Sequence, residues 1–547
     1  MKPAHTFSCI AAVALLLCGL LAANAPARNA QRGPERPHAN PSPDTNADPN
    51  ADPNPKPKPN PNPNADSKPN PNPNPKPKPN PNPNADPKPN PNPNPKPNHD
   101  KPVPTPPVTP PATTQAWWLA PSANGAIEGY ADQVSALPGD KVALRINVPD
   151  GSNYSLRVYR LDASDSGGTE LGCRPACATP HAGIAQPAAT TDPITHEIRA
   201  PWSITDTIMI GRRWQSGYYV VQFVLTSGAN SGQTGWTPLI IRRSPALPPA
   251  RVLVEIPIST WQMYNTWGGL SAYSGGPWSD VVSFDRPYAG GLLGWEYPLV
   301  RYLAREGLDV SYQTDLDTNN DPASLLQHRL VIVNGHDEYW TAATSKAFYS
   351  ARRAGVNLAF FGANIGYWRT RTQENGRALA NYKHGGDPIV DPALTTGYFR
   401  DTKPECRLLG VQHQGGLMRW PEGGYTVDAS GLSSPWFAGT GLIAGSTLPG
   451  IVSTEVDTIP NSFESLGQTC VPRMTTLFRR DMGGDTLGDA RAVTYVSRSG
   501  AKVFSAGSLN FSWGLDDIWQ RWMGQPSLVD PRLQRFVHNM LQDLAGS

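Results

Sequence analysis

The chain has 547 residues, and its 47 Lys and Arg nearly balance its 45 Asp and Glu, for a net charge of +2 at pH 7. This balance argues against a nucleic-acid partner, and the length is enough for at least two globular domains.

Residues 1–27 have the pattern of a secretory signal peptide. Lys2 precedes the apolar core AAVALLLCGLLAA, and the small residues ANAPA follow it. No stop-transfer pattern comes after this segment, so we expect a secreted, periplasmic or cell-surface protein. The sequence leaves open whether the signal is cleaved or kept as an anchor.

Residues 28–115 are a low-complexity segment built on NPNPKPKPNPNPNADP. Proline at alternate positions removes backbone donors, and no apolar residue recurs that could build a core. We predict a disordered, extended spacer rich in Pro, Asn and Lys. It would serve either as a tether to a membrane or cell wall or simply as a solubilising segment.

Four cysteines remain after the signal: Cys173, Cys177, Cys406 and Cys470. An oxidising compartment favours bridges over free thiols. We predict the pairs Cys173–Cys177, which closes the short loop CRPAC, and Cys406–Cys470.

Residues 116–245 contain short alternating runs, among them KVALRINV, YSLRVYRL, GYYVVQFVLTS and TGWTPLIIRR. Turn signals such as LPGD and SGANSG separate them. The pattern predicts an immunoglobulin-like β-sandwich.

Residues 246–547 alternate strand and helix patterns, which predicts a doubly wound α/β domain. The strand RVLVEIPI is followed by a long polar-aromatic loop, STWQMYNTWGGLSAYSGG, and then by a helix that ends at Gly307. The stretch His328–Arg369 predicts a βαβ unit with parallel strands.

Polar residues follow both strands of that unit, with His336 and Glu338 after the first and Asn364 after the second. Both turns lie at the carboxyl edge of the sheet, where open α/β folds bind ligands. An imidazole and a carboxylate there can bind a metal or move protons, although a salt-bridged or helix-capping pair is the commoner meaning of this spacing. No G-x-S-x-G elbow, nucleophilic cysteine or P-loop follows a predicted strand, which argues against acyl-enzyme or nucleotide chemistry.

Several motifs occur in one order: YNTWGG, HDEYW, GVNLAFFGANIGYWR, ANYK, STEVD and NFSWGLDD. In this order the chain resembles the large (beta) subunit of N,N-dimethylformamidase and its relatives, over roughly residues 211–547. The resemblance implies a β-sandwich before a class I glutamine amidotransferase-like, Rossmann-like domain. It also implies a mononuclear iron held by two tyrosines and one glutamate.

Matched motif by motif, the resemblance puts the iron ligands at Tyr219, Tyr264 and Glu338. Tyr218 is the alternative to Tyr219, with its side chain on the opposite face of the strand. The residues that surround the metal match His336, Asn364, Lys383 and Glu455. Three hard anionic donors suit Fe(III) better than zinc, and zinc on His336 and Glu338 remains the alternative.

The resemblance therefore implies an iron-dependent hydrolase of a small N-substituted amide, working as a homo-oligomer or with a small accessory subunit. Two departures leave the natural substrate open: Asp337 stands where the family commonly has proline, and the chain carries an export signal and spacer. The competing interpretation is a non-catalytic protein that binds glycan or cell-wall material through its aromatic loops.

Overall fold

The computed structural model describes residues 125–546 except 165–167, 173–178, 275, 291–292, 419–422, 461–469, 472 and 482–488. The predicted signal peptide, the spacer and the Cys173–Cys177 pairing lie outside these residues. Within them, no helix combines the length and the apolar character needed to cross a bilayer.

The first part of the described chain is a pair of β-sheets. A three-stranded sheet has the order β1-β3-β8, and a five-stranded sheet has the order β2-β10-β9-β4-β5. The strands are β1 Glu128–Ala131, β2 Ser135–Ala136, β3 Lys141–Asn147, β4 Tyr154–Leu161, β5 Gly168–Leu171, β8 Asp206–Met209, β9 Gly217–Leu225 and β10 Thr234–Ile241. Alternate residues of both sheets, such as Leu144, Val158 and Val221, fill one shared core.

The other face of β9 and β10 packs against the second part of the chain. Tyr218, Trp236 and Ile240 belong to the same core cluster as Val252 and Trp261. Because side chains alternate along a strand, neighbours such as Tyr218 and Tyr219 point into two different cores.

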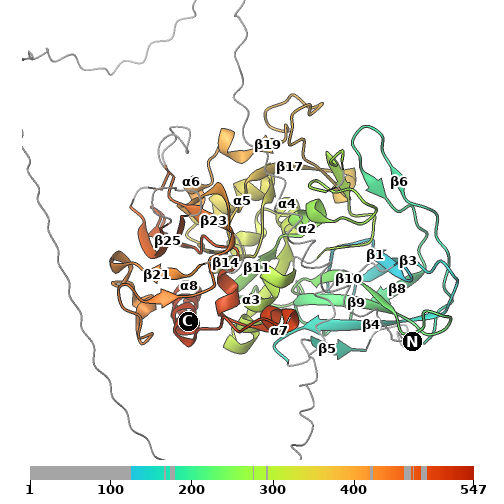
Figure 1. Ribbon diagram of the computed structural model, residues 1–547, viewed down its shortest axis with the longest axis horizontal. Helices are drawn as coiled ribbons and strands as arrows, with labels where there is room; N and C mark the ends of the chain where they lie inside the picture. The colour runs from blue at the N-terminus through green and yellow to red at the C-terminus, as the bar shows by residue number, and fades with distance from the viewer. Residues whose placement is uncertain are drawn as a thin grey trace, which may run out of the picture. The chain divides into compact units, whose positions relative to one another are not determined.

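The second part is built on a nine-stranded sheet of order β13-β11-β14-β16-β26-β25-β24-β21-β22 (Figure 1). The first five strands are parallel and the rest are antiparallel. The strands are β11 Val252–Ile256, β13 Val310–Thr314, β14 Leu330–Asn334, β16 Asn357–Phe361, β21 Tyr425–Val427, β22 Thr447–Leu448, β24 Thr475–Arg480, β25 Ala490–Val496 and β26 Lys502–Ser505.

Smaller sheets flank this one. Their strands are β6 Thr190–Thr191, β7 Ile198–Arg199, β12 Val281–Ser283, β15 Tyr339–Thr341, β17 Trp368–Gln373, β18 Ala378–Ala380, β19 Gly397–Tyr398, β20 Gln412–Met418 and β23 Thr454–Thr458. The α-helices are α2 Ile258–Tyr264, α3 Leu293–Glu306, α4 Asp315–Asn320, α5 Ala342–Arg353, α6 Cys406–Leu409, α7 Ile518–Met523 and α8 Pro531–Ala545.

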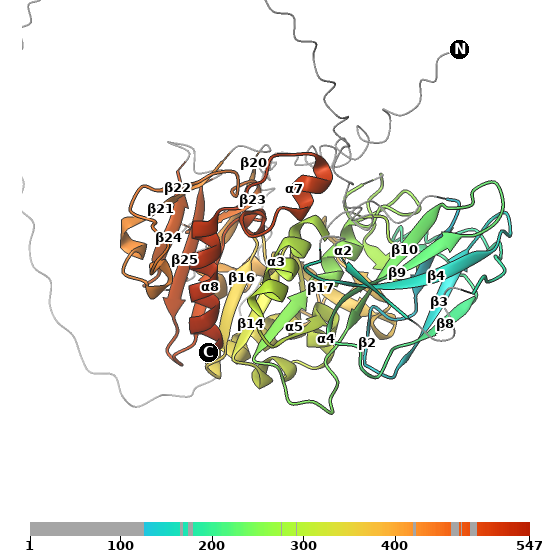
Figure 2. The same ribbon diagram turned by 90° about the horizontal axis from the view of Figure 1, so that it is seen from below.

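Helices cover both faces of the parallel strands. Leu330 and Ile332 of β14 share a core with α3 and α8, whereas Val331 and Val333 share another with α5. Figure 2 shows α8 beside β16. Such continuously buried strands need apolar side chains on both faces, which is why LVIVN has no polar alternation. The amidotransferase-like architecture implied by the resemblance remains a prediction.

The ends of two helices follow their sequence signals, whereas α2 does not. Gly307, with φ of 68°, follows α3, and the Asp530 carboxylate caps the first turn of α8. Residues 259–264, predicted as the start of the long loop after the strand, lie in the helix α2, most of whose residues are buried. Its polar groups are satisfied by distant partners, since Asp315 accepts a hydrogen bond from the Ser259 amide. The periodicity of apolar residues in the sequence cannot predict such contacts.

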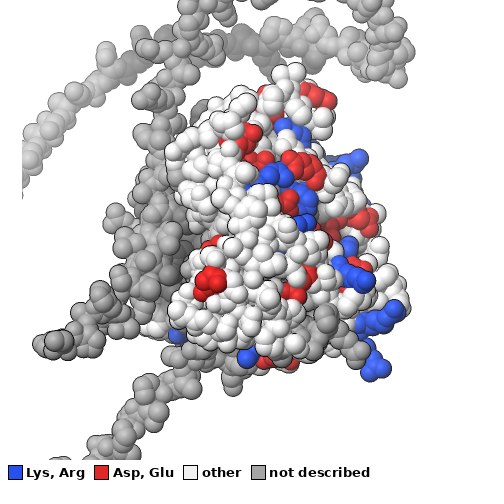
Figure 3. All heavy atoms as spheres, turned by 90° about the vertical axis from the view of Figure 1, so that its right-hand side faces the viewer, with Lys and Arg blue, Asp and Glu red and all other residues white. Residues whose placement is uncertain are grey.

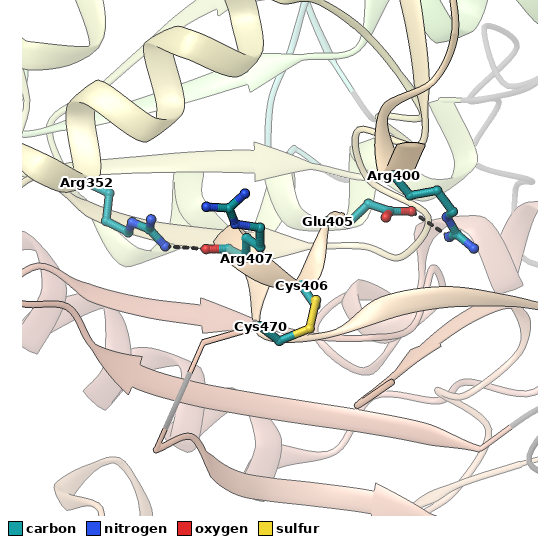
Figure 4. The surroundings of a disulfide bond; sticks show 6 residues. All are labelled: Arg352, Arg400, Glu405, Cys406, Arg407 and Cys470. Atoms are coloured by element: carbon teal, nitrogen blue, oxygen red, sulfur yellow. Dashed lines mark hydrogen bonds and ion pairs between the residues drawn. A yellow bond between two sulfur atoms is a disulfide. The ribbon is translucent and has the colours of Figure 1, made fainter. Parts of the chain in front are cut away.

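The predicted disulfide between Cys406 and Cys470 is confirmed, and Figure 4 shows it at the start of α6. It joins residues 64 apart in the sequence. Beside it, the Arg400 guanidinium donates to the Glu405 carboxylate at 2.6 Å, and Arg352 donates to the Arg407 carbonyl at 2.7 Å. The bridge thus ties α6 to the segment that precedes β24.

Figure 3 shows one face of the molecule, on which basic and acidic side chains lie interspersed. Among the described residues of this face, no broad surface of one charge is visible. This mixture agrees with the near-zero net charge of the sequence.

Candidate active site

The candidate site lies at the carboxyl ends of the parallel strands β14 and β16. The turns after these strands touch, because a Cβ atom on Gly362 would collide with the Gly335 carbonyl oxygen. Gly335 also has φ of 81°, a conformation that favours glycine. Two glycines therefore allow the turns with His336, Glu338 and Asn364 to lie against each other.

Hydrogen bonds fix both turns. The Thr260 hydroxyl of α2 accepts from the Glu338 amide at 3.0 Å. The Asp337 carbonyl accepts from the Gly366 amide at 2.8 Å, and the Glu338 carbonyl accepts from the Trp368 amide at 2.9 Å. Asn364 has φ of 55°, which asparagine tolerates better than most residues, and its amide donates to Asp457 at 2.9 Å. The polar side chains are thus held by backbone contacts.

Three oxygen-bearing side chains converge at this point. The Tyr264 hydroxyl donates to Glu338 Oε2 at 2.8 Å, and the Tyr273 hydroxyl donates to Glu338 Oε1 at 2.6 Å. The two phenol rings stack with centroids 4.1 Å apart. The Tyr339 hydroxyl in turn donates to that of Tyr273. We call Tyr264, Tyr273 and Glu338 the oxygen cluster.

The electrostatics of the oxygen cluster favour a bound cation. Burial and the neighbouring Glu338 carboxylate raise the pKa of Tyr264 and Tyr273 well above the usual value. Burial raises the pKa of Glu338 as well. All three groups therefore resist ionisation together, and a multivalent cation is what would stabilise two phenolates and a carboxylate.

No group of three or more His, Cys, Asp or Glu within the described ranges is arranged to hold a metal. The oxygen cluster is of another kind, with two phenols and one carboxylate. Its hard oxygen donors fit Fe(III).

His336 and Glu455 form an ion pair beside the oxygen cluster, with His336 Nε2 2.8 Å from Glu455 Oε2. The same nitrogen lies 3.5 Å from Glu338 Oε2. Burial alone would lower the pKa of His336, but Glu455 and Glu338 outweigh it and raise the pKa to about 9. Burial alone would raise the pKa of Glu455, yet His336 lowers it to about 2. At neutral pH the pair is charged.

Lys383 approaches the oxygen cluster from the other side. Its ammonium lies 3.1 Å from the centre of the Tyr273 ring, 5.1 Å from that of Tyr339 and 5.2 Å from that of Trp368. Burial lowers the pKa of Lys383 to about 7, against the opposing effect of Glu338. A lysine with this pKa is partly neutral at physiological pH and can exchange a proton.

Several buried polar atoms in and around the site have no hydrogen-bond partner among the described residues, and Nδ1 of His336 and Oδ1 of Asn364 are two of them. Both residues are at most 3% exposed. Unsatisfied polar atoms in a dry site cost free energy, so these atoms are natural contacts for a bound molecule.

The structure brings together six of the seven residues predicted from the sequence and leaves Tyr219 apart. The Tyr219 hydroxyl donates to the Gln215 carbonyl at 2.6 Å, and its ring stacks on Trp214 inside the sandwich core. Tyr218 points to the α/β side, where its ring lies 6.2 Å from that of Trp261. The resemblance had assigned one of the two iron-binding tyrosines to Tyr219, whereas in the structure it is Tyr273 that contacts Glu338 together with Tyr264.

Tyr273 and Tyr339 were missed by sequence reasoning. Tyr273 lies in the aromatic loop that had been noted as a whole, and Tyr339 lies within HDEYW. Asp337, the departure from the family pattern, is fully buried and accepts from the Trp340 indole at 2.7 Å. One carboxylate oxygen of Asp337 is thus hydrogen-bonded, and the other has no hydrogen-bond partner among the described residues.

The comparisons with known proteins bear on this arrangement. The family model described as "N,N-dimethylformamidase beta subunit-like, C-terminal" matches residues 155–524, more than half of the chain. No curated protein matches the sequence.

Three of the solved structures that match cover between 21% and 23% of the chain. Domain 1 of VCBP3 from Branchiostoma floridae is 8% identical and covers 23% of this chain and 100% of its own, with a TM-score of 0.15. A chain from a structure of T cell activation by the bacterial superantigen toxic shock syndrome toxin-1 is 12% identical over 21% of this chain and 98% of its own, with a TM-score of 0.14. The alkylpurine DNA glycosylase AlkC of Pseudomonas fluorescens is 10% identical over 23% and 33%, with a TM-score of 0.13. At TM-scores this low, the similarity gives no information about the fold or the function of this chain.

Proposed function

The chain belongs to the N,N-dimethylformamidase beta subunit-like family, and from this premise we propose that it is an iron-dependent hydrolase of small N-substituted amides. Family membership itself indicates a hydrolase that acts on amides. The observation that carries the proposal is the oxygen cluster, which lies beside the charged His336–Glu455 pair.

Tyr264, Tyr273 and Glu338 would hold the metal. When bound, Fe(III) would polarise the amide carbonyl and make a bound water more acidic. The phenols stay neutral in their buried site, so they would have to give up their protons in order to hold the metal. Zinc is the alternative cation, although two phenolates and a carboxylate suit it less well.

The remaining residues of the site handle protons and orientation. His336 is protonated at neutral pH and can donate to the amide nitrogen, which must be protonated before the amine can leave. Glu455 holds that imidazolium in place and would accept the proton that the attacking water loses, which can then return to His336 after the amine has left. Asn364 and Lys383 would orient the substrate or donate to the oxyanion as it develops.

The setting of the enzyme is also a proposal. The Cys406–Cys470 disulfide supports an exported protein, because such bridges persist in oxidising compartments. The N-terminal segment would act as a spacer, with tethering to a membrane or cell wall as one use. A homo-oligomer or a small accessory subunit would complete the assembly.

The test is metal analysis of the purified full chain together with a screen of N-substituted formamides and acetamides for release of free amine. We expect about one iron per chain, a tyrosinate absorption band and amine release. Glu338→Gln and Tyr264→Phe should lose all three, whereas Glu170→Gln, on an exposed strand of the sandwich, should keep them.

Three results would redirect the proposal. A metal-free chain that binds glycans and is unchanged by Glu338→Gln would favour the non-catalytic interpretation. Activity restored by zinc but not by iron after chelation would identify zinc as the metal. Iron binding without amine release from any amide would separate the metal site from the proposed reaction.

A further inference from the structure

Asp457 is a buried acidic residue of β23, 1% exposed to solvent, and the proposed mechanism gives it no role. β23 pairs with β20 in a two-stranded sheet (Figure 2). Glu455 and Asp457 are two residues apart on this strand, so their side chains point to the same side.

The two carboxyl groups of β23 reach two different turns of the candidate active site. Glu455 Oε2 lies 2.8 Å from His336 Nε2, in the turn after β14. Asp457 Oδ1 accepts a hydrogen bond at 2.9 Å from the backbone amide of Asn364, in the turn after β16. The strand itself is fixed by the segment after β26, because the Asp457 amide donates to the Gly507 carbonyl at 3.0 Å. One anchored strand therefore holds both turns.

The backbone of Asn364 depends on such a contact. Its φ of 55° lies in the left-handed region, which costs free energy for any residue with a side chain, although asparagine tolerates it better than most. A buried backbone N–H without an acceptor would add to that cost. His413 Nδ1 lies 3.8 Å from the same oxygen of Asp457, beyond hydrogen-bond distance. The Asn364 amide is thus the closer partner of that oxygen, and the bond stabilises the strained turn.

The side chain of Asn364 interacts with the same strand. Burial alone would raise the pKa of Glu455, but His336 and a hydrogen bond from the Asn364 side chain help to lower it to about 2. Only the amide nitrogen of that side chain can donate, so Nδ2 is the donor. β23 therefore contacts Asn364 through both its backbone and its carboxamide.

We propose that Asp457 is a positioning residue that acts through Asn364 and fixes its carboxamide beside the His336–Glu455 pair. Without the hydrogen bond to Asp457, the turn would relax out of the left-handed region and the carboxamide would move. A displacement of about 1 Å in an active site can cost on the order of 100-fold in rate. This inference rests on the proposed function, in which Asn364 orients the amide substrate.

A double-mutant cycle on the full, iron-loaded chain tests the proposal, with kcat and KM measured for amine release. We expect Asp457→Ala to lower kcat by about 100-fold. Asp457→Asn, whose amide oxygen can still accept the hydrogen bond, should keep most of the activity. Asn364→Gly removes the carboxamide and favours the left-handed region, so in that background Asp457→Ala should change kcat by less than about twofold.

Val456→Ala is the matched control, because Val456 is buried on the opposite side of the same strand. It weakens β23 without removing the hydrogen bond to Asn364, so its effect on kcat should be the same with and without Asn364→Gly. If Asp457→Ala also has equal effects in the two backgrounds, Asp457 has a purely structural role and the proposal is overturned.

Amide hydrogen exchange at Asn364 gives a second measurement, which does not need activity. Exchange there should be faster in Asp457→Ala and close to normal in Asp457→Asn, and both should keep their iron. An unchanged rate in Asp457→Ala would overturn the proposal. If the unaltered chain releases no amine from any amide, the proposed function fails, and the exchange rates still decide whether Asp457 holds Asn364. Asp457→Leu, which keeps the size of the side chain and lacks the acceptor, replaces Asp457→Ala if that variant does not fold.

Discussion

Replacing Tyr273 by phenylalanine removes the hydroxyl that donates to Glu338 Oε1 at 2.6 Å and leaves the ring free to stack on Tyr264. Residues that only orient the ligands of a metal typically contribute roughly 10- to 100-fold to its affinity. Because Tyr273 is one of the three proposed ligands, we expect iron affinity to fall by roughly 100-fold or more.

Tyr219→Phe is the matched control. It also removes one tyrosine hydroxyl, the one that donates to the Gln215 carbonyl at 2.6 Å inside the sandwich core. A neutral hydrogen bond contributes about 1 kcal/mol, so this variant should lose a little stability and keep its metal.

The assay measures iron per chain after dialysis at fixed free iron, the intensity of the tyrosinate absorption band and the rate of amine release. Tyr273→Phe should lower all three, and Tyr219→Phe should lower none. If Tyr219→Phe loses iron and the absorption band while Tyr273→Phe keeps both, the assignment of the oxygen cluster is wrong and the sandwich tyrosine is the ligand.

Three further substitutions test contacts that stabilise the fold around the site. Burial alone would raise the pKa of Asp387, but hydrogen bonds from Arg371 and from nearby amides lower it to about 2. The ionised carboxylate therefore contributes roughly 2 kcal/mol to the free energy of unfolding above about pH 4, and this contribution is lost as the pH falls towards about 2. Asp387→Asn should lower the free energy of unfolding at about pH 7 and reduce its loss in acid, as followed by urea unfolding. Cys406→Ser should cost roughly 4 kcal/mol, because the bridge closes a long loop, as measured by unfolding in guanidinium. Gly362→Ala should destabilise the protein by about 2–4 kcal/mol and reduce amine release, because its Cβ would push the two turns apart.

Each of these changes has a control or a contrary outcome. Acid sensitivity that is unchanged in Asp387→Asn would assign that titration to another group. Reductant should lower the stability of the unaltered chain about as much as Cys406→Ser does, and should have a much smaller effect in the variant, which keeps only the short loop that the predicted Cys173–Cys177 bridge closes. Gly172→Ala, where a Cβ would meet open space, should be nearly neutral, and an equal loss in both glycine variants would argue against the contact between the turns.

Much of the local structure follows from the sequence, because it depends on neighbouring residues. Period-two alternation predicted the strand at residues 217–225, and the unbroken apolar run predicted the buried strand at 330–334. The glycine after α3 marked its end. The ordered motifs identified the family, and they placed His336 and Glu338 at one sheet edge.

The tertiary structure decided which tyrosines reach Glu338. Alternation along β9 says that Tyr218 and Tyr219 face opposite ways, but only the packed sheets show that Tyr219 faces the sandwich core. Likewise, α2 is a helix because Asp315 and the Glu338 turn satisfy its polar groups from distant parts of the chain. Tyr273 reaches the site through an irregular loop whose course depends on long-range hydrogen bonds rather than on periodicity. The sequence by itself thus identified the family, the sheet edge that carries the site and the carboxylate Glu338. Burial and long-range contacts determined that Tyr273 is the second phenol beside that carboxylate.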